Sequence, residues 1–169
     1  MYLIFISSLN ENVKLAHQIQ TQLKELDKES EIINIVEMAL PLYDSYKEEH
    51  DGIPKSVNDL SIKMQNADGY IMVAPEYNYS IPPALTNMIA WVSRIGDDFR
   101  KLFTGKFIQL ATHSGGGGND LMYAMRMQFT KLGSLVMPRE IVTNYGKPFS
   151  KESSKRILEQ FISLKIEEK

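Results

Sequence analysis

Three short segments carry the polar side chains best placed to bind a ligand. They are SSLNEN at 7–12, PEYNYS at 75–80 and HSGGGGND at 113–120. Each follows a run of apolar residues typical of a buried strand. In open α/β folds ligands bind beyond the carboxyl ends of the strands, which meet at one edge of the sheet. We therefore expect the three loops to form one site.

The first loop supplies two hydroxyls and two side-chain amides directly before a predicted helix. Free N–H groups at a helix start, together with the positive end of the helix dipole, bind phosphate. Ordinary helix capping is an equally good explanation, because serine and asparagine are favoured N-cap residues. The loop has neither a Walker motif nor a dinucleotide glycine fingerprint, so it does not indicate a nucleoside triphosphate.

The second loop is stiffened by prolines on both sides. Pro75 precedes it, and Pro82 and Pro83 suit a helix start, where a missing N–H costs least. A stiff loop with backbone donors, Asn78 and two tyrosines can line a planar heterocycle.

The third loop contains four consecutive glycines at 115–118. Because no side chain stands in the way, this backbone can approach a flat ligand closely. A plain connector is the alternative. His113 beside it is a candidate general base, although a loop histidine is more often a solvated polar group.

Strands and helices alternate along the chain. Apolar runs predict strands at 2–6, 31–36, 69–74 and 106–112 and one within 134–143. Three- and four-residue apolar spacing predicts helices at about 12–28, 55–66, 82–95, 119–132 and 150–166, the last through Ile157, Phe161 and Leu164. Residues 37–54 contain two prolines and a glycine and are expected to form a surface loop. The methionines of AMRMQF at 124–129 are expected to fill the core.

This alternation predicts a parallel sheet covered by helices on both faces. Right-handed crossovers leave few topologies, and the flavodoxin-like strand order 2-1-3-4-5 is the economical one for five strands. We therefore expect an α/β three-layer sandwich. No repeat or linker interrupts the pattern, so residues 1–169 are predicted to be a single domain.

Composition narrows the function. A chain of 169 residues that is 43% hydrophobic and 24% charged fits one globular domain. The net charge of −2 provides no general field to attract nucleic acid or anionic membrane. There is no cysteine, which excludes disulfides and cysteine–metal sites. The start resembles a strand rather than a signal peptide, and no apolar run is long enough to span a bilayer. We expect a soluble, cytoplasmic protein without a metal site.

The segment PEYNYSIPPALTNMIAWVSR at 75–94 resembles the signature of the NADPH-dependent FMN reductase family, a flavodoxin-like group that includes chromate, quinone and azo-dye reductases. LPLYD at 40–44 and SGGGG at 114–118 fall where that family has similar segments. The resemblance runs from the first strand to about residue 145. It implies bound FMN, NADPH or NADH as electron donor, and a small acceptor such as a quinone, free flavin, azo compound or metal oxyanion.

The resemblance also implies roles for individual residues. Those expected around the FMN phosphate are Ser7, Ser8, Asn10 and Asn12. Those expected along the isoalloxazine are Pro75, Glu76, Tyr77, Asn78, Ser114, Gly115, Gly116 and Gly117. Tyr77, Tyr79 and Arg94 are candidates to border the acceptor pocket, with packing or surface pairing as the alternative. No side chain need act as a nucleophile, since the flavin carries the hydride.

Family members usually form homodimers or homotetramers, and the resemblance places the helix from Pro82 to Arg94 at or near a subunit contact. Trp91 on this helix is expected to anchor the core.

Some positions depart from the family pattern. The first loop lacks the usual leading glycine and arginine, so one charge-assisted phosphate contact is lost and FMN affinity is expected to fall by about one to two orders of magnitude. Thr86 and Ala90 replace a lysine and an aspartate, and Pro83 replaces a glycine. The family usually has an arginine near the position that Asp120 occupies here. A negative charge disfavours the extra phosphate of NADPH, so NADH is expected to serve as readily as NADPH.

Two other functions remain open at this point. One is a flavodoxin-like electron carrier, although carriers tend to be strongly acidic and −2 is a weak charge. The other is a protein that has kept the fold, has weakened or lost flavin binding, and acts through oligomerisation or ligand sensing.

Overall fold

The sheet at the centre of the molecule is parallel throughout. The computed structural model describes residues 1–164. Its strands are β1 (Tyr2–Ile6), β2 (Ser30–Asn34), β3 (Gly69–Val73), β4 (Phe107–His113), β5 (Leu135–Val136) and β6 (Ile141–Thr143). The order is β2-β1-β3-β4-β5, and β6 also pairs with β4. The predicted flavodoxin-like order 2-1-3-4-5 is confirmed.

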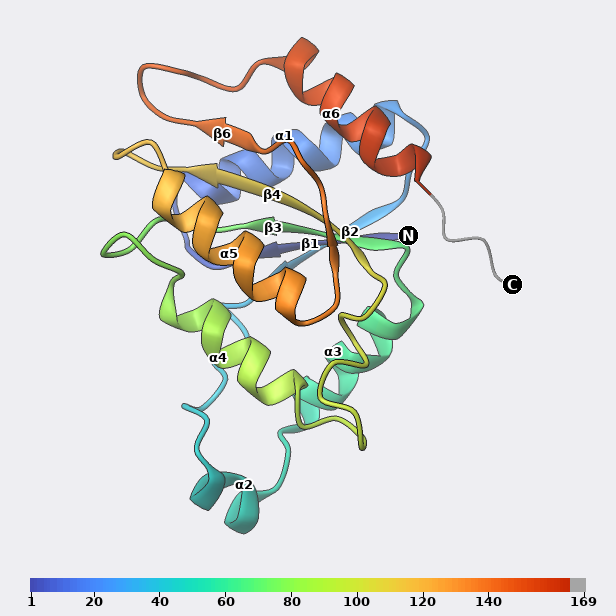
Figure 1. The fold of residues 1–169 in the computed structure, drawn as a ribbon, viewed down its shortest axis with the longest axis vertical. Helices are drawn as coiled ribbons and strands as arrows, with labels where there is room; N and C mark the ends of the chain where they lie inside the picture. Colours follow the sequence, from blue (N-terminus) through green and yellow to red (C-terminus); the bar gives the residue numbers. More distant parts are fainter. Residues whose placement is uncertain (165–169) are drawn as a thin grey trace.

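Helices cover both faces of this sheet (Figure 1). They are α1 (Glu11–Glu25), α2 (Ser45–Asp51), α3 (Lys55–Asn66), α4 (Pro83–Val92), α5 (Asn119–Lys131) and α6 (Lys151–Ser163). One layer contains α1 and α6, and the other contains α3, α4 and α5. The loops that follow β3 and β4 emerge at the same edge of the sheet. None of the described helices is both long and apolar enough to cross a membrane.

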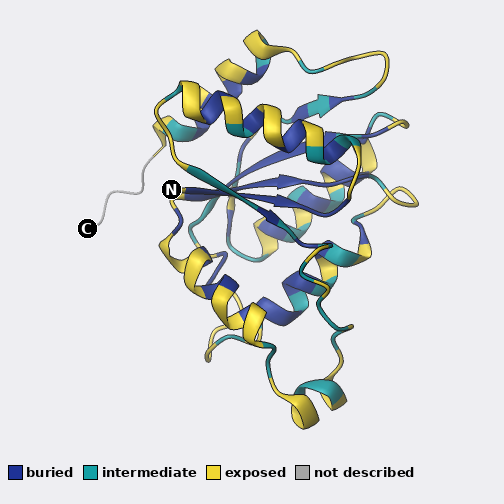
Figure 2. Ribbon diagram, turned by 180° about the vertical axis from the view of Figure 1, so that it is seen from behind, coloured by how far each residue is buried: buried dark blue, intermediate teal, exposed yellow. Residues whose placement is uncertain are grey.

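The core has two halves, one on each side of the sheet. Successive side chains of a strand point to opposite faces. Leu3 and Phe5 therefore pack with α3, α4 and α5, whereas Ile4 and Ile6 pack with α1 and α6. Figure 2 shows the result, with buried residues on the strands and on the inner sides of the helices. The inner strands β1 and β3 are apolar throughout because both of their faces are covered.

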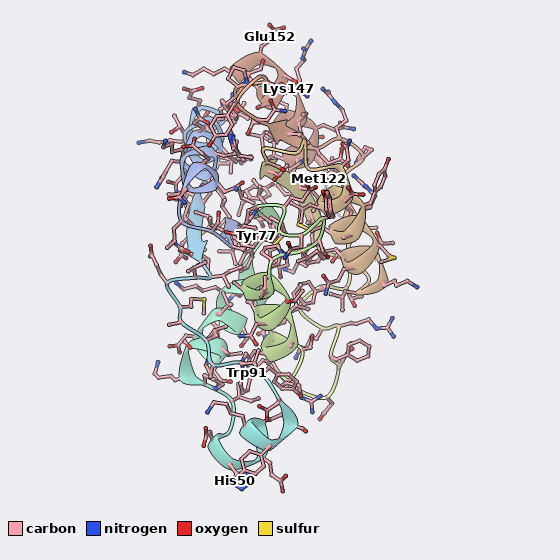
Figure 3. All side chains as sticks on the ribbon, turned by 90° about the vertical axis from the view of Figure 1, so that its left-hand side faces the viewer. His50, Tyr77, Trp91, Met122, Lys147 and Glu152 are labelled. Carbon is pink, nitrogen blue, oxygen red and sulfur yellow. The ribbon has the colours of Figure 1, made fainter. Side chains whose placement is uncertain are left out.

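The segment 37–54 contains a helix, so the prediction of a loop there was wrong. Helix α2 occupies Ser45–Asp51 and has no buried residue, which explains why no apolar spacing indicated it. Its N-cap is Asp44, whose side chain accepts a hydrogen bond from the N–H of Lys47 at 2.7 Å. The helix projects from the end of the molecule, with His50 at its tip (Figure 3).

The last part of the chain also differs from the prediction. The fifth strand is divided into β5 and β6, and Pro138, which has no N–H for a ladder bond, lies between them. Helix α6 ends at Ser163, so Leu164 lies beyond it and is 40% exposed rather than part of the apolar face. Residues 165 and 166 of the predicted helix lie outside the described part. Of the two methionines expected to fill the core, Met125 is buried, but Met127 is 61% exposed.

Trp91 anchors the core, as expected. Its side chain is fully buried, and its indole N–H donates to the Pro41 carbonyl at 2.7 Å. The side-chain amide of Asn87 also donates to that carbonyl, at 3.0 Å, and accepts from the N–H of Tyr43 at 2.8 Å. These bonds fix the LPLYD segment against α4.

Tyr70 is a buried ionisable residue that makes the stability of the core depend on pH. Its hydroxyl lies 2.9 Å from the Met64 carbonyl and 2.7 Å from the Leu102 carbonyl. Burial raises the pKa of the Tyr70 phenol above its ordinary 10.0. The folded protein thus favours the neutral phenol. The contribution of Tyr70 to the free energy of unfolding is complete below pH 10.0 and is lost as the pH rises further.

We expect Tyr70→Phe to lower the free energy of unfolding by about 1–3 kcal/mol at neutral pH, because buried carbonyls lose their donor. We also expect the variant to lose less stability than the parent above pH 10.0. Urea unfolding at neutral and alkaline pH measures both. An identical alkaline decline in the two proteins would show that other groups cause it.

Candidate functional site

The loop between β1 and α1 presents unpaired polar groups. Asn10 is the N-cap of α1, but its side chain makes no capping hydrogen bond. The Ser8 hydroxyl is buried and has no hydrogen-bond partner among the described residues. Buried polar groups are normally satisfied, so this hydroxyl and the uncapped helix start together indicate a missing acceptor. A phosphate at this point satisfies both.

This loop contains no cation of its own. Lys14, one turn into α1, pairs with Glu11 at 2.7 Å. Any phosphate here is therefore held mainly by neutral donors and by the helix dipole, as the departure from the family pattern predicts.

The loop between β3 and α4 is a tight turn with unusual backbone angles. Tyr77 and Ser80 exchange both main-chain hydrogen bonds, at 3.2 and 3.0 Å. Asn78 and Tyr79 at the tip have φ values of 50° and 60°. A bulky residue in the left-handed region is uncommon and costs on the order of 1–3 kcal/mol, and such strain concentrates at functional sites. The turn leaves Tyr77 half-exposed and Tyr79 78% exposed.

Glu76 joins this turn to the glycine loop. Its Oε2 accepts a hydrogen bond from the N–H of Leu121 in the first turn of α5, at 3.3 Å. A Cβ added at Gly116 would lie 3.2 Å from its Oε1. The carboxylate predicted to lie along the isoalloxazine therefore also holds two loops of the site together.

The glycine loop turns sharply at its end. Gly117 and Gly118 have φ values of 96° and 76°, and a Cβ at Gly118 would lie 2.7 Å from the Thr112 side chain. The Ser114 hydroxyl is buried and accepts from the N–H of Gly116 at 3.3 Å. At Gly115 an added Cβ would meet nothing within 4 Å. The backbone at Gly115 is thus open to close approach by a ligand, whereas Glu76 lies against Gly116.

Asn12 makes contacts that the sequence did not predict. Its side-chain amide donates to the carbonyl of His113 at 3.1 Å and accepts from the N–H of His113 at 2.7 Å. It is 3% exposed. Instead of presenting a free amide to a phosphate, Asn12 connects the start of α1 to the end of β4.

Two of the three predicted loops line one hollow of about 310 Å³. Its walls come from the first loop, the segment after β2, the turn after β3 and the start of α4: Ser7, Ser8, Leu9, Asn10, Val36, Tyr77, Pro82, Pro83 and Ala84. The sequence reasoning missed Leu9, Val36 and Ala84, which are apolar neighbours of the predicted polar residues. The position of Val36 directly after β2 could have indicated it, because the strand ends meet at this edge.

Arg94 does not belong to this hollow. It lies beyond the end of α4, and its Nε donates to Glu48 at 2.9 Å. Tyr43 donates to the other oxygen of Glu48 at 3.0 Å, and the Arg94 hydrogen bond is the main cause that lowers the pKa of the Glu48 carboxyl. Figure 3 shows α4 running from the Tyr77 turn toward Trp91 and α2. Arg94 is thus paired at the surface, as the alternative reading expected, and its role at an acceptor pocket stays a prediction.

His113 is half-buried and hydrogen-bonded. Its Nδ1 lies 3.1 Å from the Thr143 hydroxyl, which itself donates to the Thr112 carbonyl at 3.1 Å. The single Thr143 proton is thus used, so His113 Nδ1 is the donor. His113 is neither a freely solvated group nor part of the hollow. Within residues 1–164, no three histidine, cysteine, aspartate or glutamate side chains are grouped to hold a metal.

Comparison with known proteins gives consistent results. The model of the family described as NADPH-dependent FMN reductase matches residues 2–147. The quinone reductase of Escherichia coli K12 is 38% identical over 100 residues, which is 58% of this chain and 52% of that protein. This chain thus spans about half the length of the curated relatives that it matches first.

Solved structures agree on the fold. The flavoenzyme NAD(P)H:(acceptor) oxidoreductase FerB from Paracoccus denitrificans superposes with a TM-score of 0.74 at 19% identity, covering 96% of this chain and 93% of its own. A flavodoxin from the domain Archaea superposes with a TM-score of 0.66 at 14% identity, covering 96% and 97%.

Proposed function

Because the chain belongs to the NADPH-dependent FMN reductase family, we propose that it is an oxidoreductase that uses bound FMN to pass electrons from a nicotinamide nucleotide to a small acceptor. FMN and a reduced nicotinamide nucleotide are the cofactors of that family. The observation that carries the proposal is the uncapped start of α1 beside the buried, unpaired Ser8 hydroxyl. A phosphate is the group that satisfies both.

The residues of the site fit FMN in separate roles. Ser7, Ser8 and Asn10, with the first N–H groups of α1, would hold the phosphate. The turn at Tyr77 and Asn78 after Pro75, and the backbone of 114–117, would hold the ring on two sides. Bound FMN supplies hydride transfer, so the protein has only to bind, orient and exclude water. Glu76 and Asn12 fix the three loops in place for that task.

The nature of the electron acceptor is proposed from the exposed side chains of the turn after β3. The exposed rings of Tyr77 and Tyr79 suit a flat molecule such as a quinone, and they support a free flavin or an azo compound equally. A metal oxyanion is the remaining candidate. We further propose that Asp120, in the first turn of α5, disfavours the extra phosphate of NADPH, so that NADH serves as readily. A single FMN-binding domain, a homodimer or homotetramer and a cytoplasmic location remain predictions.

Absorption spectroscopy tests the function directly. We expect the apoprotein to bind FMN, and anaerobic NADH or NADPH to bleach the bound flavin band. Reoxidation by a quinone would then complete the cycle. Bound flavin that neither nucleotide reduces would favour an electron carrier, and no binding at tens of micromolar FMN would mean that the fold has lost its flavin.

Ser8→Ala separates ligand binding from folding. The Ser8 hydroxyl has no hydrogen-bond partner within residues 1–164, so its removal should not lower the stability of the apoprotein. FMN would lose one neutral hydrogen bond, and its Kd should rise about three- to tenfold. Calorimetric titration and thermal unfolding measure the two effects.

Ser61→Ala is the matched control for Ser8→Ala. Ser61 is also buried, but its hydroxyl donates to the Asn58 carbonyl at 2.7 Å, away from the site. This variant should lose stability and keep its FMN affinity. A Ser8→Ala protein that behaves in the same way would refute the phosphate role.

A further inference from the structure

Three of the described helices begin beside the candidate site. They are α1, α4 and α5, which follow the first loop, the turn after β3 and the glycine loop. The edge of the sheet that carries these loops faces the viewer in Figure 3. A helix start with free N–H groups is a common place for a protein to bind an anion. A negatively charged acceptor could therefore bind here only if one of the three starts still offers such groups.

The start of α4 offers few donors. Its N-cap is Pro82 and its first residue is Pro83, and both line the hollow that contains Ser8 and Tyr77. Because proline has no backbone N–H, two groups that would otherwise be available to an anion are absent. An acceptor beside this helix therefore meets apolar ring surface rather than hydrogen-bond donors.

The start of α5 is occupied by the protein's own carboxylates. Glu76 accepts the hydrogen bond from the N–H of Leu121 at 3.3 Å, and Asp120 lies one residue earlier, in the first turn of the helix. Acidic side chains at this position interact favourably with the positive end of the helix dipole. Glu76 is half-buried and Asp120 is exposed. An anion that approaches the glycine loop thus meets two negative charges of the protein.

The start of α1 is the place proposed for the FMN phosphate, so it is not available to an acceptor. None of the residues that line the adjoining hollow carries a charge. Lys14, one turn into α1, is paired with Glu11 at 2.7 Å. No side chain in the wall of the hollow therefore neutralises the negative charge of a bound phosphate, which adds to the charges at the start of α5.

The groups that remain for an acceptor are aromatic. Arg126 on α5 is paired with Glu140, and Lys147 lies toward α6 in Figure 3, away from Tyr77. Tyr77 and Tyr79 are 49% and 78% exposed. A tyrosine ring stacks on flat molecules, and its face attracts cations. The surface is thus suited to a planar group that is neutral or positively charged.

We propose that the site selects its electron acceptor by charge: it takes planar molecules that are uncharged or positively charged and excludes anions, metal oxyanions among them. The inference rests on the proposed function and narrows its range of acceptors. The overall reaction with a quinone is that NADH and one proton yield the hydroquinone and NAD⁺. The nicotinamide ring becomes positively charged as it gives up hydride, so the same negative field suits the donor.

Binding to the oxidised, FMN-loaded protein measures this selection without turnover. The probes are 1,4-naphthoquinones that carry a methyl, a sulfonate or a trimethylammoniomethyl group at position 2, so they share one ring system and differ in charge. In calorimetric titrations at an ionic strength of about 0.01 M, the Kd of the cationic quinone should be about tenfold lower than that of the anionic quinone. At about 1 M the Debye length falls from about 30 Å to about 3 Å, and most of this difference should disappear.

Asp120→Lys tests the assigned charge. It should bring the two Kd values close to each other at low ionic strength and leave the Kd of the methyl quinone unchanged. Asp97→Lys is the matched control, because it changes the net charge of the protein by the same amount. Asp97 is exposed and follows the end of α4 that lies away from the Tyr77 turn, so the ratio of the two Kd values should stay as in the parent.

The outcomes separate this inference from the proposed function. Equal Kd values for the cationic and anionic quinones at low ionic strength would overturn the selection by charge and leave the proposed function intact. The same holds if none of the three quinones binds, or if Asp97→Lys changes the ratio as much as Asp120→Lys does. Chromate reduced by NADH as fast as the methyl quinone would also overturn the inference alone. Failure to bind FMN, or bound FMN that neither nucleotide reduces, would overturn the proposed function and the inference with it.

Discussion

Gly116→Val is expected to abolish FMN binding in the micromolar range while leaving the apoprotein folded. A Cβ at this position points at Glu76, 3.2 Å from Oε1, in the gap between the turn after β3 and the glycine loop. The two extra methyl groups of valine would fill the space assigned to the ring or push Glu76 away from the N–H of Leu121. Gly116 has no left-handed φ, so the backbone itself accepts valine with a modest loss of stability.

Two further variants identify the cause of that loss. Gly116→Ala adds the Cβ alone and should weaken FMN by an intermediate amount. Combining Gly116→Val with Glu76→Ala removes the side chain that the valine meets. If displacement of Glu76 is the cause, the double variant should recover part of the affinity, and direct obstruction of the ring predicts no recovery. Calorimetric titration with FMN measures each Kd, and unchanged affinity in Gly116→Val would make the loop a passive connector.

The sheet was predictable largely because the inner strands β1 and β3 are short, uninterrupted apolar runs. Helices cover both faces of the sheet, so neighbouring residues that point to opposite faces, such as Ile4 and Phe5, are both buried, and the sequence shows no polar alternation. The same reasoning failed for α2. A helix with no buried residue leaves no apolar spacing, and α2 is fixed instead by its Asp44 cap and by the pairing of Glu48 with Arg94.

The site was predictable to the extent that its residues lie next to strand ends. Ser8 and Tyr77 follow β1 and β3, and the parallel sheet brings them to one hollow. Contacts between distant residues carry no such local signal. Arg94 follows the motif in sequence, but α4 carries it away from the turn to Glu48. The partner of Asn12 is 101 positions away, and spacing within SSLNEN cannot reveal it.

Asn12 shows what the structure adds to the family pattern. The resemblance assigns it to the phosphate together with Asn10, because both are amides in the first loop. In the structure the Asn10 side chain is exposed and makes no capping bond, whereas the buried Asn12 amide donates one N–H to the His113 carbonyl and accepts from the His113 N–H. One asparagine is therefore available to a ligand, and the other holds the phosphate loop against the strand that leads into the glycine loop.

The two asparagines should consequently respond differently to alanine. Asn12→Ala leaves the N–H and carbonyl of His113 without their partner in a largely buried place, and it should lower the free energy of unfolding of the apoprotein by about 2 kcal/mol or more. It should also raise the Kd for FMN by about tenfold or more, because two loops of the site lose their connection. Asn10→Ala should raise the Kd by about three- to tenfold without loss of stability.

Urea unfolding of the apoproteins and calorimetric titration with FMN give the four values needed. Amide hydrogen exchange at His113 adds a direct reading, since its N–H is protected by Asn12 and should exchange faster in Asn12→Ala alone. A residue that only contacts the ligand would leave the apoprotein unchanged. Equal stability of the Asn12→Ala and parent apoproteins would therefore return Asn12 to the phosphate, and a loss of both stability and affinity would establish that binding depends on how the loops are held as well as on what they present.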